Sequence, residues 1–235
     1  LVQAGKLSAL GQMSANISHE LNQPLMAIQN FAETARAYLA RDRQSEAEEN
    51  LGLITDQTNR MTRIIRNLKA FARKDAEPSE PGDMHAVVSA AMAMAAQRLD
   101  ASDVTVTLAV TEPDLIVRGG RVRLEQVVLN LLSNAADALE GCPERRVALN
   151  LSATARDVTL TVCDTGPGIE DTERVFEPFY STKDMGASKG MGLGLSISYG
   201  IVVSFGGDLQ AHNTPDGGAV FTLILTRIAA QEPPP

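Results

Sequence analysis

The first 75 residues carry apolar side chains at alternating spacings of three and four, and this repeat limits the possible folds more than any other feature. The spacing predicts two long helices, each with one apolar seam of the coiled-coil type. Glycine and proline, which weaken or break helices, are scarce in this region. The first seam consists of Leu7, Leu10, Ser14, Ile17, Leu21, Pro24, Ile28, Phe31, Ala35 and Tyr38, and the second of Leu51, Ile54, Thr58, Met61, Ile65, Leu68 and Ala72.

A hairpin of two such helices, joined by the polar segment 40–50, leaves apolar surface in water. Because two helices cannot bury both seams alone, we expect two copies of the chain to associate as a four-helix bundle. Residues 1–75 are therefore predicted to form a helical hairpin that makes the protein a homodimer.

The pattern changes after a linker that is rich in proline and acidic residues and is assigned to 76–83. Beyond it, alternating apolar residues predict strands and amphipathic stretches predict helices. Strands are expected at 104–110, 114–117, 146–153 and 157–164, helices at 83–99, 121–139 and up to about 205, and a closing hairpin around TPDGG at 214–218. The predicted fold class is α+β, with a second domain at 84–228 and a tail at 229–235.

Composition excludes several classes of function. The formal net charge is −8 and no basic stripe is present, which argues against nucleic-acid binding because phosphate contacts need clustered Lys and Arg. No run of 18 apolar residues and no signal-peptide pattern occurs, so we expect no membrane contact by this stretch itself. Cys142 and Cys163 lack metal-ligand spacing and fit buried thiols in a reducing compartment.

The segment SHELNQPL, residues 18–25, places His19 and Glu20 side by side on the first helix. A second histidine four residues after the first would indicate a zinc hydrolase, but Gln23 occupies that position, and an amide is a poor zinc ligand. On the register of the seam, His19 falls at the most outward position. The histidine is therefore accessible and needs another explanation.

Two motifs in the second domain offer oxygen and backbone contacts to a ligand. Asn130 and Asn134 lie four apart on one helix face, where amide oxygens could reach a hydrated Mg²⁺. Asp164 ends an apolar strand, and Gly166 and Gly168 after it allow close approach of backbone to a ligand. Taken alone, the first motif also fits solvated polar residues and the second an ordinary turn.

A third group of residues surrounds a glycine-rich stretch. Phe176 and Phe179 could anchor a loop that carries Lys183, a possible phosphate contact. The glycines before the last helix would expose backbone N–H groups that favour an anion; they are Gly190, Gly192 and Gly194. No strand leads directly into them, so they do not form a dinucleotide-binding fingerprint.

In this order, the motifs resemble those of the catalytic core of sensor histidine kinases of two-component systems. The resemblance runs from about residue 3 to residue 226 and includes an H box at His19, an N box at 130–134, glycine boxes at 164–168 and 190–194, and an F box at 176–179. HELNQPL and the Lys-Ala-Phe-Ala-Arg sequence that ends the second helix resemble the branch that senses C4-dicarboxylates or oxygen.

The resemblance implies a dimerisation and phosphotransfer domain, followed by an α/β sandwich that binds ATP and Mg²⁺. His19 would attack the γ-phosphate with help from Glu20, Asp164 would accept from the adenine amino group, and Asn134 would bind the metal. The phosphoryl group would then pass to a response regulator. The chain would be the cytoplasmic part of a longer bacterial inner-membrane sensor protein.

Two other functions remain open at this stage. The chain could be an ATP-binding signalling scaffold, or a regulator phosphatase without autokinase activity. A gyrase-like ATPase is disfavoured, because the related ATPases carry a glutamate where this chain has Asn130. Asn22 and Gln23 depart from commoner family patterns, which makes phosphatase activity less firmly implied than kinase activity.

Overall fold

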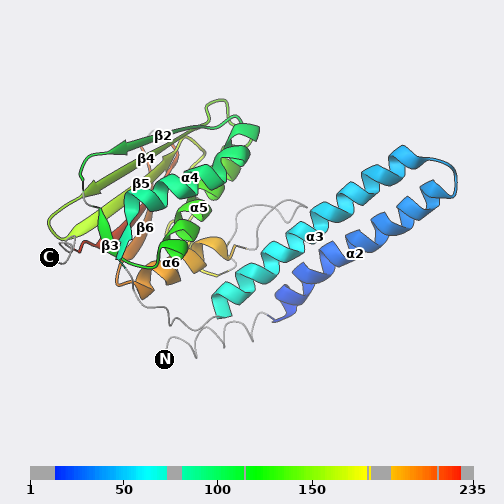
Figure 1. Ribbon diagram of the computed structural model, residues 1–235, viewed down its shortest axis with the longest axis horizontal. Coiled ribbons are helices and arrows are strands. Elements are labelled where there is room, and N and C mark those ends of the chain that lie inside the picture. Colours follow the sequence, from blue (N-terminus) through cyan, green and yellow to red (C-terminus); the bar gives the residue numbers. More distant parts are fainter. Residues whose placement is uncertain are drawn as a thin grey trace, which may run out of the picture. The chain divides into compact units, whose positions relative to one another are not determined.

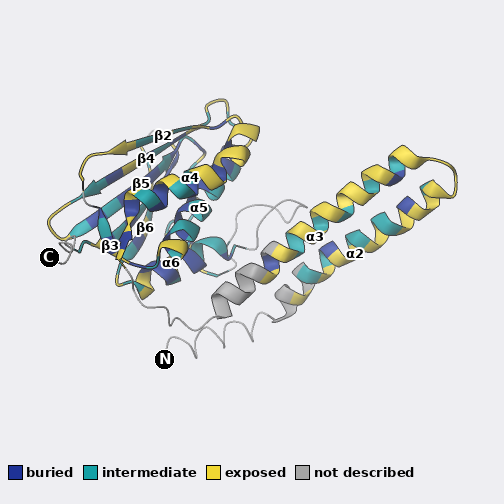
Figure 2. Ribbon diagram, in the orientation of Figure 1, coloured by how far each residue is buried: buried dark blue, intermediate teal, exposed yellow. Residues whose placement is uncertain are grey.

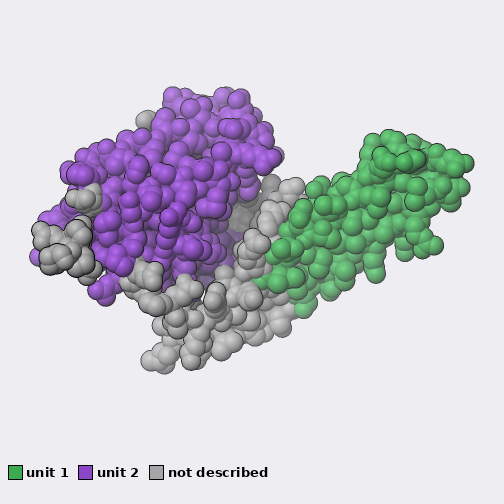
Figure 3. Space-filling model, viewed as in Figure 1, with its two compact units in different colours: residues 1–74 green, residues 75–235 purple. Residues whose placement is uncertain are grey.

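The computed structural model describes residues 14–72, 81–113, 115–178, 180, 192–215 and 217–228. The chain divides into two compact units, residues 1–74 and 75–235 (Figure 3). Each unit has its own secondary structure, and each is described by itself below.

The first unit is a hairpin of two antiparallel helices, α2 (Ser14–Leu39) and α3 (Gln44–Ala72) (Figure 1). Asp42 adopts a positive φ of 58° in the tight connection, a conformation that aspartate tolerates better than most residues. Arg43 closes the turn: its guanidinium pairs with Glu46 and lies 4.7 Å from the centroid of the Tyr38 ring. Among the described residues, no helix combines the length and hydropathy needed to cross a membrane.

The burial pattern of the hairpin matches the predicted seams only in part (Figure 2). On α2, the seam residues Pro24 and Ala35 are buried. On α3, Ala47 and Ile64 are buried among the residues whose side chains the structure describes, and the predicted seam omits both. Seam residues Leu51 and Ile65 are 52% and 53% exposed, because one partner helix can cover only one side of the seam.

The second unit is built on a five-stranded sheet of order β2-β4-β5-β7-β6. Strand β2 pairs parallel with β4, and every other neighbouring pair in this sheet is antiparallel. The strands are β2 (Thr105–Val110), β4 (Arg146–Ala153), β5 (Asp157–Asp164), β6 (Asp208–Asn213) and β7 (Ala219–Thr226). The predicted closing hairpin is formed by β6 and β7.

Three helices cover one face of this sheet: α4 (Met84–Ala101), α5 (Arg121–Ala138) and α6 (Gly194–Ser204) (Figure 1). Along β5, burial alternates strictly, so that Val158, Leu160, Val162 and Asp164 are buried and the residues between them are half-buried. The α5 side chains that complete the core include Leu124, Val127, Val128, Leu131 and Leu132. The predicted α+β architecture is confirmed.

The linker is shorter at its C-terminal end than the sequence indicated. Residues 81–83 form a strand, β1 (Pro81–Asp83), which pairs with β3 (Ile116–Arg118). Proline is tolerated as the first residue of such a short ribbon, because its missing N–H costs little there. Asp83 then caps α4 by accepting a hydrogen bond from the N–H of His85 at 2.9 Å.

Gly207, between α6 and β6, lies where the chain packs closely against β7. A Cβ on Gly207 would lie 2.4 Å from the backbone oxygen of Ile224 and 2.7 Å from Cδ2 of Leu225. Gly207→Ala should therefore lower the free energy of unfolding of the second unit by about 1–3 kcal/mol, the usual cost of overpacking. Urea unfolding followed by circular dichroism measures this change.

Gly52 provides the control, since a Cβ there would meet no atom within 4 Å. Gly52→Ala replaces a glycine inside α3 with a better helix former and should stabilise the first unit by about 0.5–1 kcal/mol. Equal stability of Gly207→Ala and the wild-type chain would contradict the close contact with β7.

Candidate active site

Asp164 lies at the end of β5 on the face covered by the helices, and only 4% of it is exposed. Its Oδ1 accepts hydrogen bonds from the backbone N–H groups of Gly166, at 2.9 Å, and Ala219, at 3.2 Å. A buried carboxylate needs such donors because it has lost its water of hydration. Both bonds fall on Oδ1, so Oδ2 takes part in neither.

Burial raises the pKa of the Asp164 carboxyl above its ordinary value, and the two backbone donors only partly oppose this shift. The ionised carboxylate is thus incompletely compensated within the protein. A ligand N–H that reached it would make a charge-assisted hydrogen bond, which is stronger than one between neutral groups.

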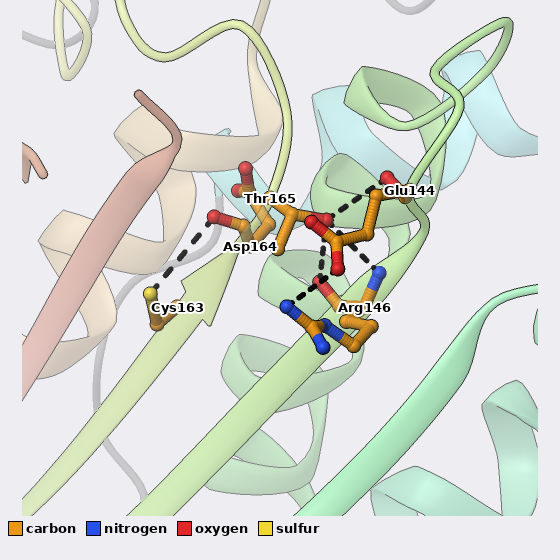
Figure 4. A network of polar contacts seen from close by, with 5 residues as sticks. All are labelled: Glu144, Arg146, Cys163, Asp164 and Thr165. Atoms are coloured by element: carbon orange, nitrogen blue, oxygen red, sulfur yellow. Dashed lines mark hydrogen bonds and ion pairs between the residues drawn. The ribbon is translucent and has the colours of Figure 1, made fainter. Parts of the chain in front are cut away.

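The chain directly after Asp164 is held by a second set of polar contacts (Figure 4). Thr165 donates its N–H to the backbone oxygen of Arg146 at 3.1 Å and its hydroxyl to that of Glu144 at 3.0 Å. The side chains of Arg146 and Glu144 form an ion pair at 2.6 Å. These contacts anchor the end of β5 at the point where the following loop begins.

Asn130 and Asn134 lie one turn apart on α5, and both are half-buried. Asn130 donates from Nδ2 to Oγ of Ser198 on α6, at 3.0 Å. A Cβ on Gly194, the first residue of α6, would lie only 2.4 Å from Oδ1 of Asn130. The absence of a side chain at Gly194 therefore allows the first turn of α6 to approach Asn130.

Helix α5 brings three of the motifs together. A Cβ on Gly166 would lie 3.4 Å from the Cβ of Ala138, so the loop after β5 packs against the end of α5. Asn134 is four residues after Asn130, which meets α6, and four before Ala138, which meets the loop. Because positions four apart share a helix face, the two asparagines, the loop after Asp164 and the start of α6 border one region.

The loop after Asp164 is held in shape by a residue that the sequence did not indicate. Asn213, at the end of β6, accepts from the N–H of Ile169 at 2.6 Å and donates to its oxygen at 2.7 Å. Gly168 beside it has a φ of 85°, and a Cβ there would lie 2.9 Å from Oδ1 of Asn213. The predicted glycine is thus needed both for its backbone conformation and for the approach of Asn213.

The remaining predicted site residues are described only in part. Lys183, Gly190 and Phe179 lie outside the described residues, whereas Gly192 has a φ of 64° and precedes α6. His19 and Glu20 belong to α2, but their side chains also lie outside what the structure describes. Gln23 is half-buried on the same helix.

The residues of the second unit fit a magnesium nucleotide. Amide oxygens are hard donors of the kind that Mg²⁺ accepts, and the first turn of α6 offers backbone N–H groups to an anion. Within the described part of the chain, no group of three or more His, Cys, Asp and Glu side chains could hold a metal ion. A nucleotide-bound Mg²⁺ could take amide and phosphate oxygens as ligands here.

Two family models match the chain. Residues 9–77 match the His Kinase A (phospho-acceptor) domain, and residues 119–228 match the histidine kinase-, DNA gyrase B-, and HSP90-like ATPase. The first match includes His19, and the second includes both asparagines and Asp164.

Curated relatives match nearly the whole chain. It is 44% identical over 228 residues to the C4-dicarboxylate transport sensor protein DctB of Pseudomonas aeruginosa, a match that covers 96% of this chain and 37% of that protein. The protein of the same name from Rhizobium meliloti is 36% identical over 219 residues, or 92% of this chain and 35% of that protein. The chain thus spans little more than a third of the length of these relatives.

Among solved structures, the chain resembles histidine kinase ThkA in complex with the response regulator protein TrrA. The TM-score is 0.78, with 96% of this chain and 64% of that chain covered, at 23% sequence identity. At this identity the likeness shows the fold.

The raised pKa of Asp164 gives a testable dependence of stability on pH. A carboxyl whose pKa is raised in the folded state stabilises the fold when it is protonated. This stabilisation is fully present below the pKa of the unfolded state, about 4, and is lost as the pH rises through the pKa of the folded state. Asp164→Asn removes this loss while keeping an acceptor for Gly166 and Ala219. The Tm of the variant minus the Tm of the wild-type chain should therefore increase from pH 4 to pH 7.

Differential scanning calorimetry of the ligand-free protein across this pH range measures the difference. The matched control is Thr159→Val, a change on the same strand that alters no ionisable group and should show no comparable trend. A Tm difference for Asp164→Asn that stayed constant with pH would show that the buried carboxyl is already fully compensated.

Proposed function

Because the chain belongs to the sensor histidine kinases of two-component signal transduction, we propose that it transfers the γ-phosphoryl group of ATP to His19. The helical unit carries His19, and the second unit binds the nucleotide. The observation that carries the proposal is the convergence on α5 of Asp164 and its loop, the two asparagines and the first turn of α6.

The adenine is proposed to lie at Asp164. Oδ1 already accepts two backbone hydrogen bonds, and Oδ2 can accept from the exocyclic amino group of adenine. A guanine base presents a carbonyl at the corresponding position, which a carboxylate repels. This arrangement would select ATP over GTP.

The phosphates are proposed to lie at the glycine-rich start of α6. Free N–H groups in the first turn of a helix attract anions, and Gly194 keeps this turn open beside Asn130. Backbone contacts are assigned to Gly190, Gly192 and Gly194, together with Gly166 and Gly168 at the loop, and Lys183 is assigned a phosphate contact.

Asn134 is proposed as the protein ligand of Mg²⁺. Its amide oxygen is a donor that this cation accepts, and it lies on α5 between the two regions assigned to adenine and phosphate. When bound with the nucleotide, Mg²⁺ neutralises phosphate charge.

The transfer itself uses residues of α2. A ring nitrogen of His19 forms a bond to the γ-phosphorus, the bond from that phosphorus to the leaving oxygen of ADP breaks, and Glu20 takes the proton released by the ring. A neutral imidazole is a competent nucleophile near neutral pH. Positioning of His19 and the phosphate accounts for most of the catalysis in such reactions.

Asn130 favours a kinase over a simple ATPase. An amide cannot take a proton from water, and Nδ2 of Asn130 donates one of its hydrogen bonds to Ser198. The second unit would therefore hold ATP until a nucleophile from the helical unit reaches it. An ATP-binding scaffold without phosphotransfer is the second candidate, and the labelling experiment below separates the two.

We also propose that the protein is a homodimer. Leu25 and Leu39, two heptads apart on α2, are 45% and 54% exposed, and Leu51 and Ile65 are similarly exposed two heptads apart on α3. A heptad repeat keeps such residues on one line of a helix. A second copy of the hairpin would cover these apolar lines in a four-helix bundle.

The partner of the phosphorylated chain is proposed to be a response regulator that accepts the phosphoryl group on an aspartate. ThkA, which shares the fold, forms a complex with a response regulator protein, TrrA. The similarity to the longer DctB sensor proteins of two bacteria supports a place for this chain in a longer bacterial sensor protein. We propose that the chain is the cytoplasmic part of such a protein in the inner membrane.

The first prediction from this function concerns the phosphoacceptor. His19→Ala should abolish transfer of label from γ-labelled ATP to the protein, because the nucleophile is lost, while nucleotide binding is retained in the other unit. His85→Ala, a change of the exposed histidine at the start of α4, is the control and should label like the wild-type chain. Acid-labile, base-stable label would identify a phosphohistidine.

The outcomes separate the candidate functions. Label that survives His19→Ala would refute the assignment of His19. Absence of label with bound ATP would favour the scaffold, and rapid release of free phosphate without labelled protein would favour an ATPase.

The second prediction concerns Gln23, which lies one turn after His19 on α2. Its amide could orient a water molecule for in-line attack on a regulator phosphoaspartate. Gln23→Ala should leave labelling of His19 largely intact but slow dephosphorylation of the phosphorylated cognate receiver domain by about tenfold, the effect of ~1.4 kcal/mol.

The measurement is the lifetime of receiver-domain phosphate in the presence of ADP. Gln29→Ala, a change of the exposed glutamine further along α2, is the matched control and should behave as wild type. Equal lifetimes with the wild-type and Gln23→Ala proteins would exclude a phosphatase role for Gln23.

A further inference from the structure

Ser198 is a buried polar residue in an otherwise apolar part of the molecule. Only 1% of it is exposed, and its neighbours on α6, Ile197, Ile201 and Val202, are core residues. Alanine at this position would fill nearly the same space without a polar atom. A buried hydroxyl is costly unless it is hydrogen-bonded, so its contacts indicate what it does.

The hydroxyl oxygen of Ser198 accepts the hydrogen bond from Nδ2 of Asn130 across the α5–α6 interface, at 3.0 Å. The two residues are 68 positions apart in the chain. An asparagine amide has a donating end and an accepting end, and an acceptor placed at one end determines which way the amide faces.

The other end of the same amide lies at the start of α6. A Cβ on Gly194 would lie 2.4 Å from Oδ1 of Asn130 but 3.0 Å from Nδ2, so the oxygen is the nearer atom. Ser198 lies one turn further along α6. The amide therefore directs its oxygen toward the end of α6 and its NH₂ group toward the core.

We propose that Ser198 is a positioning residue that fixes the orientation of the Asn130 amide, so that an oxygen rather than an NH₂ group faces the magnesium and phosphate end of the site. This inference rests on the proposed nucleotide site. Mg²⁺ and its bound waters need acceptor atoms, and an NH₂ group in the same place would repel them. Asn130 touches the ligand, and Ser198 acts only through Asn130.

Removal of the hydroxyl should affect metal use more than nucleotide affinity. In Ser198→Ala, the amide can rotate, and the Mg²⁺ concentration for half-maximal binding of an ATP analogue should rise about tenfold, equivalent to ~1.4 kcal/mol. Binding of ADP without Mg²⁺ should not change, because the base is held at Asp164. Ser198→Thr keeps the hydroxyl and should restore the wild-type requirement for Mg²⁺.

A double-mutant cycle distinguishes positioning from packing. Mg²⁺ titrations by calorimetry with a non-hydrolysable ATP analogue would compare the wild-type chain, Ser198→Ala, Asn130→Ala and the double variant. If Ser198 acts through Asn130, then Ser198→Ala has no further effect once Asn130 is alanine. The proposal would be overturned if the two substitutions multiplied in their effects on the Mg²⁺ requirement. It would also be overturned if Ser198→Ala left that requirement unchanged, or if Ser198→Thr raised it as much as Ser198→Ala.

The binding assay keeps this inference separate from the proposed phosphotransfer. If the wild-type chain bound the magnesium nucleotide but never labelled His19, the kinase assignment would fail while the cycle still tested Ser198. If Ser198→Ala folded poorly, Ser198→Cys would replace it, since sulfur has a similar size and is a weak acceptor.

Discussion

The second unit is organised around one buried carboxylate. Asp164 occupies a position on β5 where the alternation of the strand would otherwise place an apolar residue. Because a buried charge must be hydrogen-bonded, two separate segments have to supply backbone N–H groups to it, one from the loop after β5 and one from the start of β7. The conformation of both segments follows from this requirement. Gly218 illustrates it, since a Cβ there would lie 2.2 Å from the backbone oxygen of Asp164.

Helix α5 links the loop after Asp164 to the start of α6. Its apolar side packs in the core, its polar side carries Asn130, which meets α6, and its last residue, Ala138, meets the loop after Asp164. The contact between Asn130 and Ser198 is a polar bond within an apolar interface. Such bonds add little net stability but restrict how two helices and their side chains can be arranged. In the magnesium site that we propose, where an oxygen and a nitrogen would act differently on the metal, that restriction is the useful property.

Sequence reasoning identified the elements of this site but not the contacts between them. Asp164, Asn130 and Gly194 were indicated because a polar or glycine residue stood out against a periodic apolar pattern. Ser198 and Asn213 gave no such signal, since one serine in a helix and one asparagine before a turn are ordinary. Their roles come from partners 68 and 44 residues away, a separation that local patterns do not encode. The prediction of which α3 residues are buried was partly wrong for a related reason. Periodicity defines an apolar stripe on the helix, but the partner helix decides which side of that stripe is covered.

The order of the strands has a consequence for how the protein acquires its structure. The central pair β5–β7 joins segments that flank the loop after Asp164, α6 and β6. This pair can close only after the whole intervening stretch has folded back, and the parallel pair β2–β4 likewise waits for α5 to cross over. Contacts this distant in sequence form slowly, because the chain entropy is lost before the contacts are made. Completion of the core and assembly of the site therefore depend on the same long-range strand pairings.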